Sequence, residues 1–276
     1  MKTAVAGHTE WIEFGQIERV PRAGEIVHAV DGWEEAGGGG AVAAVQLARL
    51  AGSCTFFTAL GDDARALWTK RDLAGLGVRV RAATRAEPSR RAMTLVDAEG
   101  ERTIATFGRR LEPCAADHLP WDELKETDAV YFTAGDDGAL RAARQARVLV
   151  ATSRTMGRLA ETDVPLDAVV GSGRDPAERY DPDALSTPPR LVVVTAGRAG
   201  GRYETDDGRS GTFETPPPPG PVVDTYGAGD SFAAGLTFAL GRGDDVEDAL
   251  ALAARCGAWV VAGKGPYANQ LTADQL

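Results

Sequence analysis

The residues with the clearest chemistry lie between Asp224 and Leu240, in the stretch DTYGAGDSFAAGLTFAL. A glycine turn precedes apolar residues at helical spacing, so the N–H groups of Gly227, Ala228 and Gly229 are predicted at a helix N-terminus. Free backbone donors and the positive end of the helix dipole favour a bound anion such as a phosphate. Asp230 follows in the first turn, where we expect it to be ionised at neutral pH.

These residue types suit phosphoryl transfer to an alcohol. The amides would stabilise negative charge on the moving phosphoryl group, while the carboxylate of Asp230 orients the attacking hydroxyl and accepts its proton. A purely structural interpretation is also open, in which Asp230 caps the helix and the glycines only form a tight turn.

The elements around this stretch alternate between apolar runs and helical patterns. Buried strands are predicted at 3–7, 54–60, 129–135, 147–153, 167–172 and 190–197, and helices at 40–50, 64–76, 137–146, 228–240 and 246–261. The runs are apolar almost throughout, which is typical of parallel strands covered on both faces. The alternation predicts an α/β fold with a doubly wound, mostly parallel sheet, and residues 1–276 are expected to form a single domain.

Two segments break this alternation, approximately 16–30 and 89–107. Both have the pattern of exposed antiparallel strands without a helix of their own, and the second contains a turn at DAEGE. Together they predict a small β-sheet lid inserted in the α/β core. Exposed strand edges often pair between two copies of a chain, so a homodimer through the lid is an open alternative to a monomer.

Composition excludes several classes of function. A formal net charge of −10 argues against a nucleic-acid partner, because binding phosphate backbones requires a basic face. The chain has no apolar run long enough to cross a bilayer and no signal-peptide pattern, so a cytoplasmic protein is expected. Its three cysteines and three histidines are scattered without metal-ligand spacing, so no zinc site is predicted.

The glycine turn also resembles a family signature. DTYGAGDSF is similar to the D-T-x-G-A-G-D motif of the ribokinase-like (PfkB) carbohydrate kinase family. Further similarities follow in family order: VPRAGEIVHA (20–29), GGGGAVAAVQLARLAG (37–52), FFTALGDDARA (56–66), VDAEGERTI (96–104) and VVTAGRAGG (193–201). The resemblance implies a ribokinase-like fold and a kinase that transfers the γ-phosphoryl group of ATP, with Mg²⁺, to a hydroxyl of a sugar or sugar derivative.

The resemblance also suggests where the substrates lie. Gly39 and Gly40 match the glycine pair that closes over the sugar. The residues implied for ATP are Thr195, Gly197, Gly200, Thr225, Cys256 and Gly257, although a place in the hydrophobic core is an equal alternative for the last two. The family's substrate-binding aspartate is replaced by Ile12, so Glu10 or Glu13 would have to substitute for it, and Glu10 is preferred.

Two other features bear on the metal and the substrate. The family's N-x-x-E motif, associated with magnesium and phosphate, is SGRD here, which leaves Asp175 as the candidate metal residue. Arginines flank both ends of the lid hairpin, namely Arg90, Arg91, Arg109 and Arg110. If they converge, with Arg91 among the substrate-binding residues, they suit a phosphorylated or carboxylated substrate; a solvated lid surface is the alternative.

Competing motifs are poorer matches. GGGGAVAA imitates a dinucleotide-binding turn, but the acidic DGWEEA precedes it in place of a buried strand. AGKGPY lacks the glycine spacing of a phosphate-binding P-loop. Two alternatives remain open: a nucleoside kinase of the same fold, and a degenerate relative that binds a sugar without phosphorylating it.

Overall fold

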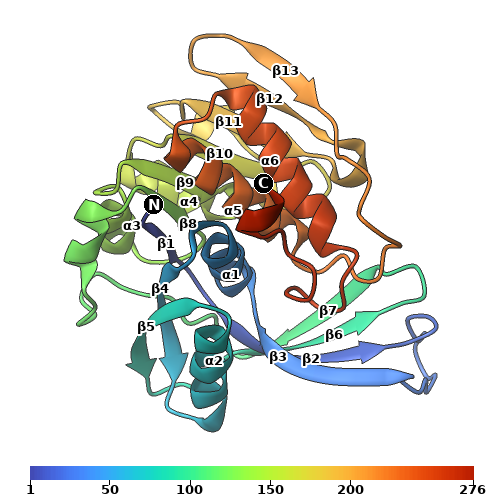
Figure 1. Ribbon diagram of the computed structural model, residues 1–276. Helices are drawn as coiled ribbons and strands as arrows, with labels where there is room; N and C mark the ends of the chain where they lie inside the picture. Colours follow the sequence, from blue (N-terminus) through green and yellow to red (C-terminus); the bar gives the residue numbers. More distant parts are fainter.

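A computed structural model describes all 276 residues. Its larger sheet has nine strands in the order β13-β12-β11-β10-β9-β8-β1-β4-β5 (Figure 1). Their bounds are β1 (Thr3–Ala6), β4 (Cys54–Gly61), β5 (Val78–Arg85), β8 (Ala129–Phe132), β9 (Val148–Thr152), β10 (Ala168–Ser172), β11 (Leu191–Thr195), β12 (Gly201–Thr205) and β13 (Ser210–Phe213). All strands from β5 to β11 pair in parallel, and only the pairings of β11 with β12 and of β12 with β13 are antiparallel.

Burial explains which strands the sequence revealed. Every residue of β1, β4, β8 and β9 is buried, and apart from a few threonines these strands are apolar, as predicted. All six predicted strands are confirmed. The three missed strands, β5, β12 and β13, lie at the two ends of the sheet, where polar residues alternate with apolar ones and no continuous apolar run forms.

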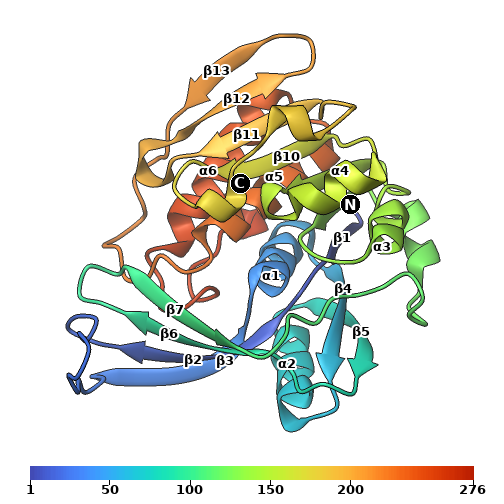
Figure 2. The ribbon, with the colours of Figure 1, turned by 180° about the vertical axis from the view of Figure 1, so that it is seen from behind.

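Helices cover both faces of the sheet, which confirms the doubly wound fold. One face carries α1 (Gly39–Ala51), α2 (Ala64–Gly75), α5 (Ala228–Arg242) and α6 (Val246–Val260); the other carries α3 (Asp137–Ala143) and α4 (Met156–Thr162) (Figures 1 and 2). Two separate hydrophobic clusters, of 42 and 16 buried residues, fill the two sides. The five predicted helices are confirmed within a few residues, and α4 was not predicted.

The lid is a second sheet of four strands in the order β3-β2-β6-β7. Its strands are β2 (Glu10–Gln16), β3 (Asp31–Gly37), β6 (Arg91–Val96) and β7 (Arg102–Phe107). They project to one side of the larger sheet (Figure 2). The predicted hairpin at 89–107 is confirmed by the antiparallel pairing of β6 with β7.

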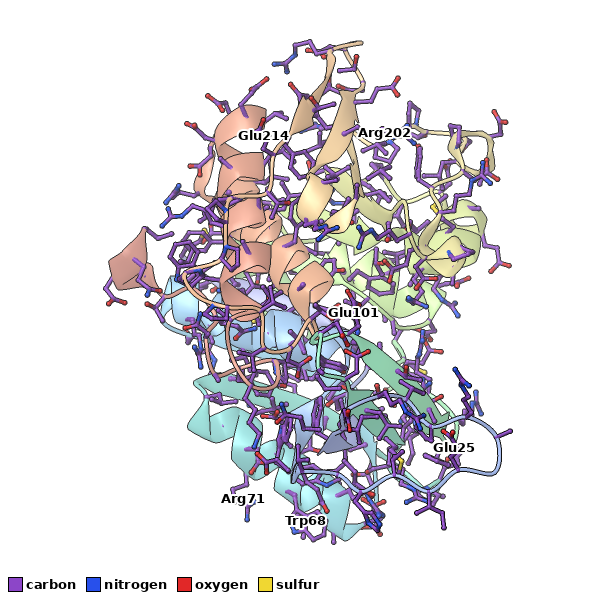
Figure 3. The ribbon with its side chains drawn as sticks, turned by 90° about the vertical axis from the view of Figure 1, so that its right-hand side faces the viewer. Glu25, Trp68, Arg71, Glu101, Arg202 and Glu214 are labelled. Atoms are coloured by element: carbon purple, nitrogen blue, oxygen red, sulfur yellow. The ribbon has the colours of Figure 1, made fainter.

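The prediction of lid strands at 16–30 was wrong. Residues 17–30 form the loop that joins β2 to β3, and the two strands lie on either side of it. Pro21 and Gly24, with a φ of 86°, interrupt extended pairing, and Ile26 and Val30 are exposed. Figure 3 shows Glu25 of this loop at the outer end of the lid. The strands themselves were hidden because acidic residues interrupt the apolar pattern of DGWEEAG and EWIEFGQ.

Aromatic contacts hold the lid against the core. Phe14 of β2 stacks on Trp33 of β3 at 4.7 Å between ring centroids and meets the ring of Tyr226 edge-on at 5.4 Å. Trp11 lies 5.3 Å from Trp68 of α2. These buried contacts join β2 and β3 to both α2 and the loop before α5, so this half of the lid is part of the packed core.

Candidate active site

A cavity of about 270 Å³ lies at the carboxyl ends of the parallel strands. Residues at or just after the ends of five neighbouring strands line it: Thr195, Gly171, Thr152, Thr133 and His8. Gly39, Gly227, Gly229 and Asp230 line it from the helix N-termini, and Ile104 and Thr106 from the lid. Open α/β sheets bind ligands at this edge, so core and lid together enclose the candidate site.

The two helices that begin at the cavity have no side-chain cap at the N-terminus, which they share with α4 but not with the remaining three helices. An aspartate side chain caps the first turn of α2, α3 and α6. By contrast, α1 and α5 begin at Gly38 and Gly227, with no side-chain cap. The N–H groups of Gly227, Gly229 and Asp230 make no hydrogen bond within the chain, and that of Ala228 reaches only the Thr225 carbonyl, at 3.4 Å. These donors are therefore available to an anion, as the sequence predicted.

Asp230 lies beside these donors, with its side chain partly exposed at the cavity. Burial, and next the negative charge of Glu178, raises the pKa of its carboxyl from 3.8 to about 7. The expectation that Asp230 is fully ionised at neutral pH was therefore wrong, because desolvation outweighs the helix dipole. A carboxyl with a pKa near 7 is better matched to proton transfer than an ordinary aspartate.

Hydrogen bonds from two directions hold the loop before α5, which contains Asp224 and Tyr226. The carboxylate of the buried Asp224 accepts hydrogen bonds from the N–H groups of Tyr226, at 2.8 Å, and Gly265, at 3.2 Å. The Tyr226 hydroxyl accepts a bond from the Gly38 N–H at 2.9 Å, which ties this loop to the start of α1. A side chain at Gly39 would lie 2.7 Å from Oδ1 of Asp230, so any larger residue there would displace this carboxylate. Gly40 packs on Phe56 instead and does not line the cavity.

Of the two candidate glutamates, only Glu10 lies at the cavity. Its buried carboxylate is 3.2 Å from Nε of Arg90, and burial raises its pKa. Glu13 lies on the other face of β2 and pairs with Arg91 at 3.6 Å. Two buried polar atoms near the Glu10 end of the cavity have no hydrogen-bond partner, His8 Nδ1 and Thr133 Oγ1, and the ion pair between Glu10 Oε2 and Arg90 Nε lacks hydrogen-bond geometry. Unpaired buried groups of this kind match the hydroxyls of a polyol.

The flanking arginines separate into two pairs. Arg90 and Arg110 line the cavity. Arg91 lies instead on the half-exposed Glu13, and Arg109 is 79% exposed beside Glu87, so the placement of Arg91 in the site was wrong. Neighbouring residues of an extended segment point to opposite sides, so that only one of Arg90 and Arg91 could face the cavity.

A third arginine, Arg154, lines the cavity and was not predicted. It lies two residues after the end of β9, and a position near the carboxyl end of a predicted strand was the one signal available. Its guanidinium bonds Asp175 at 2.6 Å and Glu178 at 2.7 Å. Burial, then the charges of Arg110, Arg90 and Arg154, lowers the pKa of the enclosed His8 to about 3, so this imidazole is neutral.

The candidate metal residue Asp175 is occupied by other contacts. It caps the short helix η3 (Pro176–Glu178), pairs with Arg154, and does not line the cavity. Glu178, three residues further on, is the carboxylate that reaches the wall. No group of three metal-ligating side chains exists in the chain. The side chains therefore fit a magnesium ion held mainly by nucleotide phosphates, with at most one carboxylate nearby, better than a metal cage made by the protein.

The predicted nucleotide residues are dispersed. Thr195 lines the cavity. Gly197 and Gly200, with φ of 64° and 81°, form the turn that follows β11. A side chain at Gly200 would collide with the carbonyl of Phe213, so the backbone there requires glycine whether or not a nucleotide binds.

The other three nucleotide candidates lie behind or beside the loop. Cys256 is fully buried against Gly235 of α5, so its thiol cannot touch a ligand and its assignment to the site was wrong. A side chain at Gly257 would lie 3.2 Å from the Ala228 carbonyl, which places Gly257 directly behind the anion-binding turn. Thr225 contacts the lid hairpin.

A proton acceptor beside unpaired backbone donors, under a lid at the edge of a doubly wound sheet, defines a class of enzyme that transfers phosphoryl groups to alcohols. Comparison with known proteins agrees with this class. The family model described as "pfkB family carbohydrate kinase" matches residues 2–160 and 166–273. The chain belongs to this family of ATP-using kinases.

Individual relatives are similar over the whole length. The chain is 28% identical to the ATP-dependent ribose-1-phosphate kinase of Halopiger xanaduensis, over 98% of this chain and 95% of the relative. Ribokinase from Thermotoga maritima has a similar fold, with a TM-score of 0.79 and 20% identity, covering 100% of this chain and 97% of the other. Arabidopsis thaliana ribokinase, solved with ribose and ATP, gives a TM-score of 0.76 at 24% identity, covering 98% and 96%. None of the helices could span a membrane.

Proposed function

We propose that this enzyme uses ATP to phosphorylate a free hydroxyl of a sugar that already carries a phosphate group. The observation that carries the proposal is the presence of Arg90 and Arg110 in the cavity that also contains Asp230. The name of the Halopiger relative, a ribose-1-phosphate kinase, supports the same substrate class.

Charge balance distinguishes Arg110 from its neighbours. Arg154 already has two carboxylate partners, and Arg90 has Glu10. Arg110 lines the cavity with no ion pair, and burial together with the charges of Arg90 and Arg154 lowers its pKa. A sugar phosphate would relieve this repulsion and accept charge-assisted hydrogen bonds from the guanidinium, which suits phosphate geometry.

The order of strands indicates which end of the cavity receives the phosphate of the sugar. Arg90 and Arg110 lie at the base of the lid, next to Glu10 and β1. Thr195 lies at the end of β11, four strands away from β1 in the sheet. We assign the β1 side to the sugar phosphate and the β11 side to ATP, with Asp230 between them.

In the proposed reaction, the sugar hydroxyl oxygen forms a bond to the γ-phosphorus of ATP. The bond from that phosphorus to the bridging oxygen of ADP breaks, and the hydroxyl proton passes to the carboxylate of Asp230. The amides of Gly227, Ala228 and Gly229 hold the phosphoryl oxygens. Magnesium, bound to the nucleotide, shields the phosphate charges, so chelation should abolish turnover and added Mg²⁺ should restore it.

The test is an ATP-consumption assay with ribose 1-phosphate, ribose 5-phosphate, ribose, gluconate and adenosine, run on the native chain and on Arg110→Ala. We expect turnover with a sugar phosphate, and in Arg110→Ala a KM for that substrate about 10- to 100-fold higher, because a charged hydrogen bond is worth about 1.5–3 kcal/mol. The KM for ATP should stay within about twofold. Arg91→Ala is the matched control, since Arg91 faces away from the cavity.

Three outcomes would contradict the proposal. Preferred use of ribose or gluconate would assign the arginines to another role. Preferred use of adenosine would favour a nucleoside kinase. A large rise in the KM for ATP in Arg110→Ala would place this arginine on the nucleotide.

A further inference from the structure

The tip of the lid hairpin touches the anion-binding loop. Nη1 of Arg102, the first residue of β7, donates to the carbonyl oxygen of Thr225 at 3.0 Å and to its hydroxyl oxygen at 3.2 Å. The Thr225 N–H and hydroxyl both bond the carbonyl of Gly100, at 3.1 Å each. Figure 3 shows Glu101 of this tip beside the C-terminal half of the chain, far from the outer end of the lid at Glu25.

The carbonyl that Arg102 holds has a second role. It is also the acceptor for the Ala228 N–H, at the long distance of 3.4 Å. A short, charge-assisted bond from the lid therefore satisfies this carbonyl, and the Ala228 amide is only weakly engaged. That amide is one of the donors assigned to the transferred phosphoryl group.

Arg102 also acts on the charges beneath it. Burial raises the pKa of Asp230, Glu178 raises it further, and Arg102 is the leading group that opposes the rise. Burial likewise raises the pKa of Asp224, and the N–H bonds from Tyr226 and Gly265, followed by the charge of Arg102, oppose this rise. The guanidinium of Arg102 lies 6.0 Å from the ring centroid of Tyr226, a residue that stands between Asp224 and Asp230 in the sequence.

We propose that Arg102 is a positioning residue that links the lid to the reaction: by holding the Thr225 carbonyl it keeps the Ala228 amide free for the phosphoryl group. The link forms only while the hairpin tip lies on the loop. The idea rests on the proposed function, because it takes the anion-binding role of the loop from there.

The lid does not need Arg102 in order to fold. Its β2–β3 half is held by the contacts of Phe14 with Tyr226 and of Trp11 with Trp68, and β6 pairs with β2 along its whole length. Arg102 is exposed at the end of the hairpin, so its removal opens no cavity in the core. Loss of this side chain should therefore change turnover more than stability.

The test compares Arg102→Ala, Arg102→Lys and the control Arg91→Ala, another exposed lid arginine. We expect Arg102→Ala to lower kcat about tenfold with less than a threefold change in both KM values. The acidic limb of its pH profile should move to higher pH, because Asp230 loses a nearby positive charge. Arg102→Lys, which keeps the charge without the planar fork, should restore the position of the limb and only part of kcat.

Other results would overturn the proposal. An unchanged kcat and pH profile in Arg102→Ala would make the contact incidental. An effect of Arg102→Ala on KM alone would indicate that Arg102 contacts the substrate directly. If Arg102→Ala lowers both kcat and the melting temperature, and Arg102→Lys restores both equally, the role of Arg102 is structural. The kinetics are measured on whichever sugar the native enzyme phosphorylates, so a wrong substrate class does not affect the result, and failure to phosphorylate any sugar would reject the proposed function itself.

Discussion

The central strands of the larger sheet and the outer strand of the lid lie around the same cavity but differ in solvent exposure. Every residue of β1, β8 and β9 is buried, whereas every residue of β7 is exposed. The start of α5, which packs on these central strands, supplies Asp230 and the backbone donors, and the lid region supplies Thr106, Ile104 and, at its base, Arg90. Groups that take part in bond changes thus lie on the close-packed core, and groups suited to recognition lie on the less packed sheet.

Burial also separates the two regions electrostatically. In the core, desolvation raises the pKa of Asp230 to about 7. At the base of the lid, Arg90 and Arg110 bring positive charge to the same cavity. We therefore expect substitutions in the core loop to change turnover, and substitutions around the lid to change substrate affinity.

The largest effect is expected for Asp230→Asn. Asparagine keeps the size of the side chain but cannot take the proton of the hydroxyl, so kcat should fall by roughly 10²–10⁴ while ATP binding is retained. Steady-state kinetics and a nucleotide-binding titration measure the two quantities. Near-normal turnover would remove Asp230 from the proposed base role and, with it, the contrast between core and lid.

A second substitution, Gly39→Ala, should move the carboxylate of Asp230 without changing its chemistry. In Gly39→Ala the new methyl group would lie 2.7 Å from Oδ1 of Asp230, so the carboxylate must shift. A displacement of about 1 Å costs roughly 10² in rate, and kcat should fall by about that factor. Gly75→Ala, in open space at the end of α2, is the matched control and should be fully active. Equal activity of the two variants would show that the carboxylate has room to adjust.

The two glutamates of β2 sharpen the comparison on the lid side. Glu10→Ala should raise the KM for the sugar substrate about tenfold, because the Glu10 carboxylate lies at the cavity beside Arg90. Glu13→Ala, on the opposite face of the same strand, should leave both KM values unchanged. A larger effect of Glu13→Ala in the same kinetic assay would reverse the assignment.

The smallest effect concerns stability. Because the folded pKa of Asp230 is raised from 3.8 to about 7, its ionisation destabilises the fold fully above about pH 7, and this penalty disappears as the pH falls below about 4. Asp230→Asn should therefore be about 1–4 kcal/mol more stable than the native chain at pH 8, at 1.36 kcal/mol per pKa unit, and the difference should shrink at pH 5. Urea unfolding at both pH values measures it, and a variant that is less stable at pH 8 would contradict the buried charge.

Sequence patterns predicted the core better than the lid. A strand covered on both faces is apolar almost throughout, and the six predicted strands were found from that property. β2 and β3 were placed wrongly because Glu13, Glu34 and Glu35 interrupt their apolar pattern, and the more apolar loop at 17–30 was taken for a strand. A strand with one exposed face has few apolar positions, so its position depends on what it pairs with.

The candidate site shows the same division. The spacing of Gly227, Gly229 and Asp230 is local, so the sequence predicted the donors and the acid together. Arg154, Glu178 and His8 come from segments far apart in the chain, and only strand order brings them to one cavity. The pKa of Asp230 was misjudged for the same reason, since the helix dipole is a local effect and desolvation depends on everything that packs around the carboxyl.

The sequence by itself thus determined the fold class, the anion-binding turn and the acid beside it, because each depends on residues close together in the chain. Tertiary structure decided that Glu10 and not Glu13, Arg90 and not Arg91, and Glu178 and not Asp175 reach the cavity. Which residue of each pair reaches the cavity depends on which side of its backbone segment faces the cavity. That orientation is set by packing against segments distant in sequence, so no local sequence pattern specifies it.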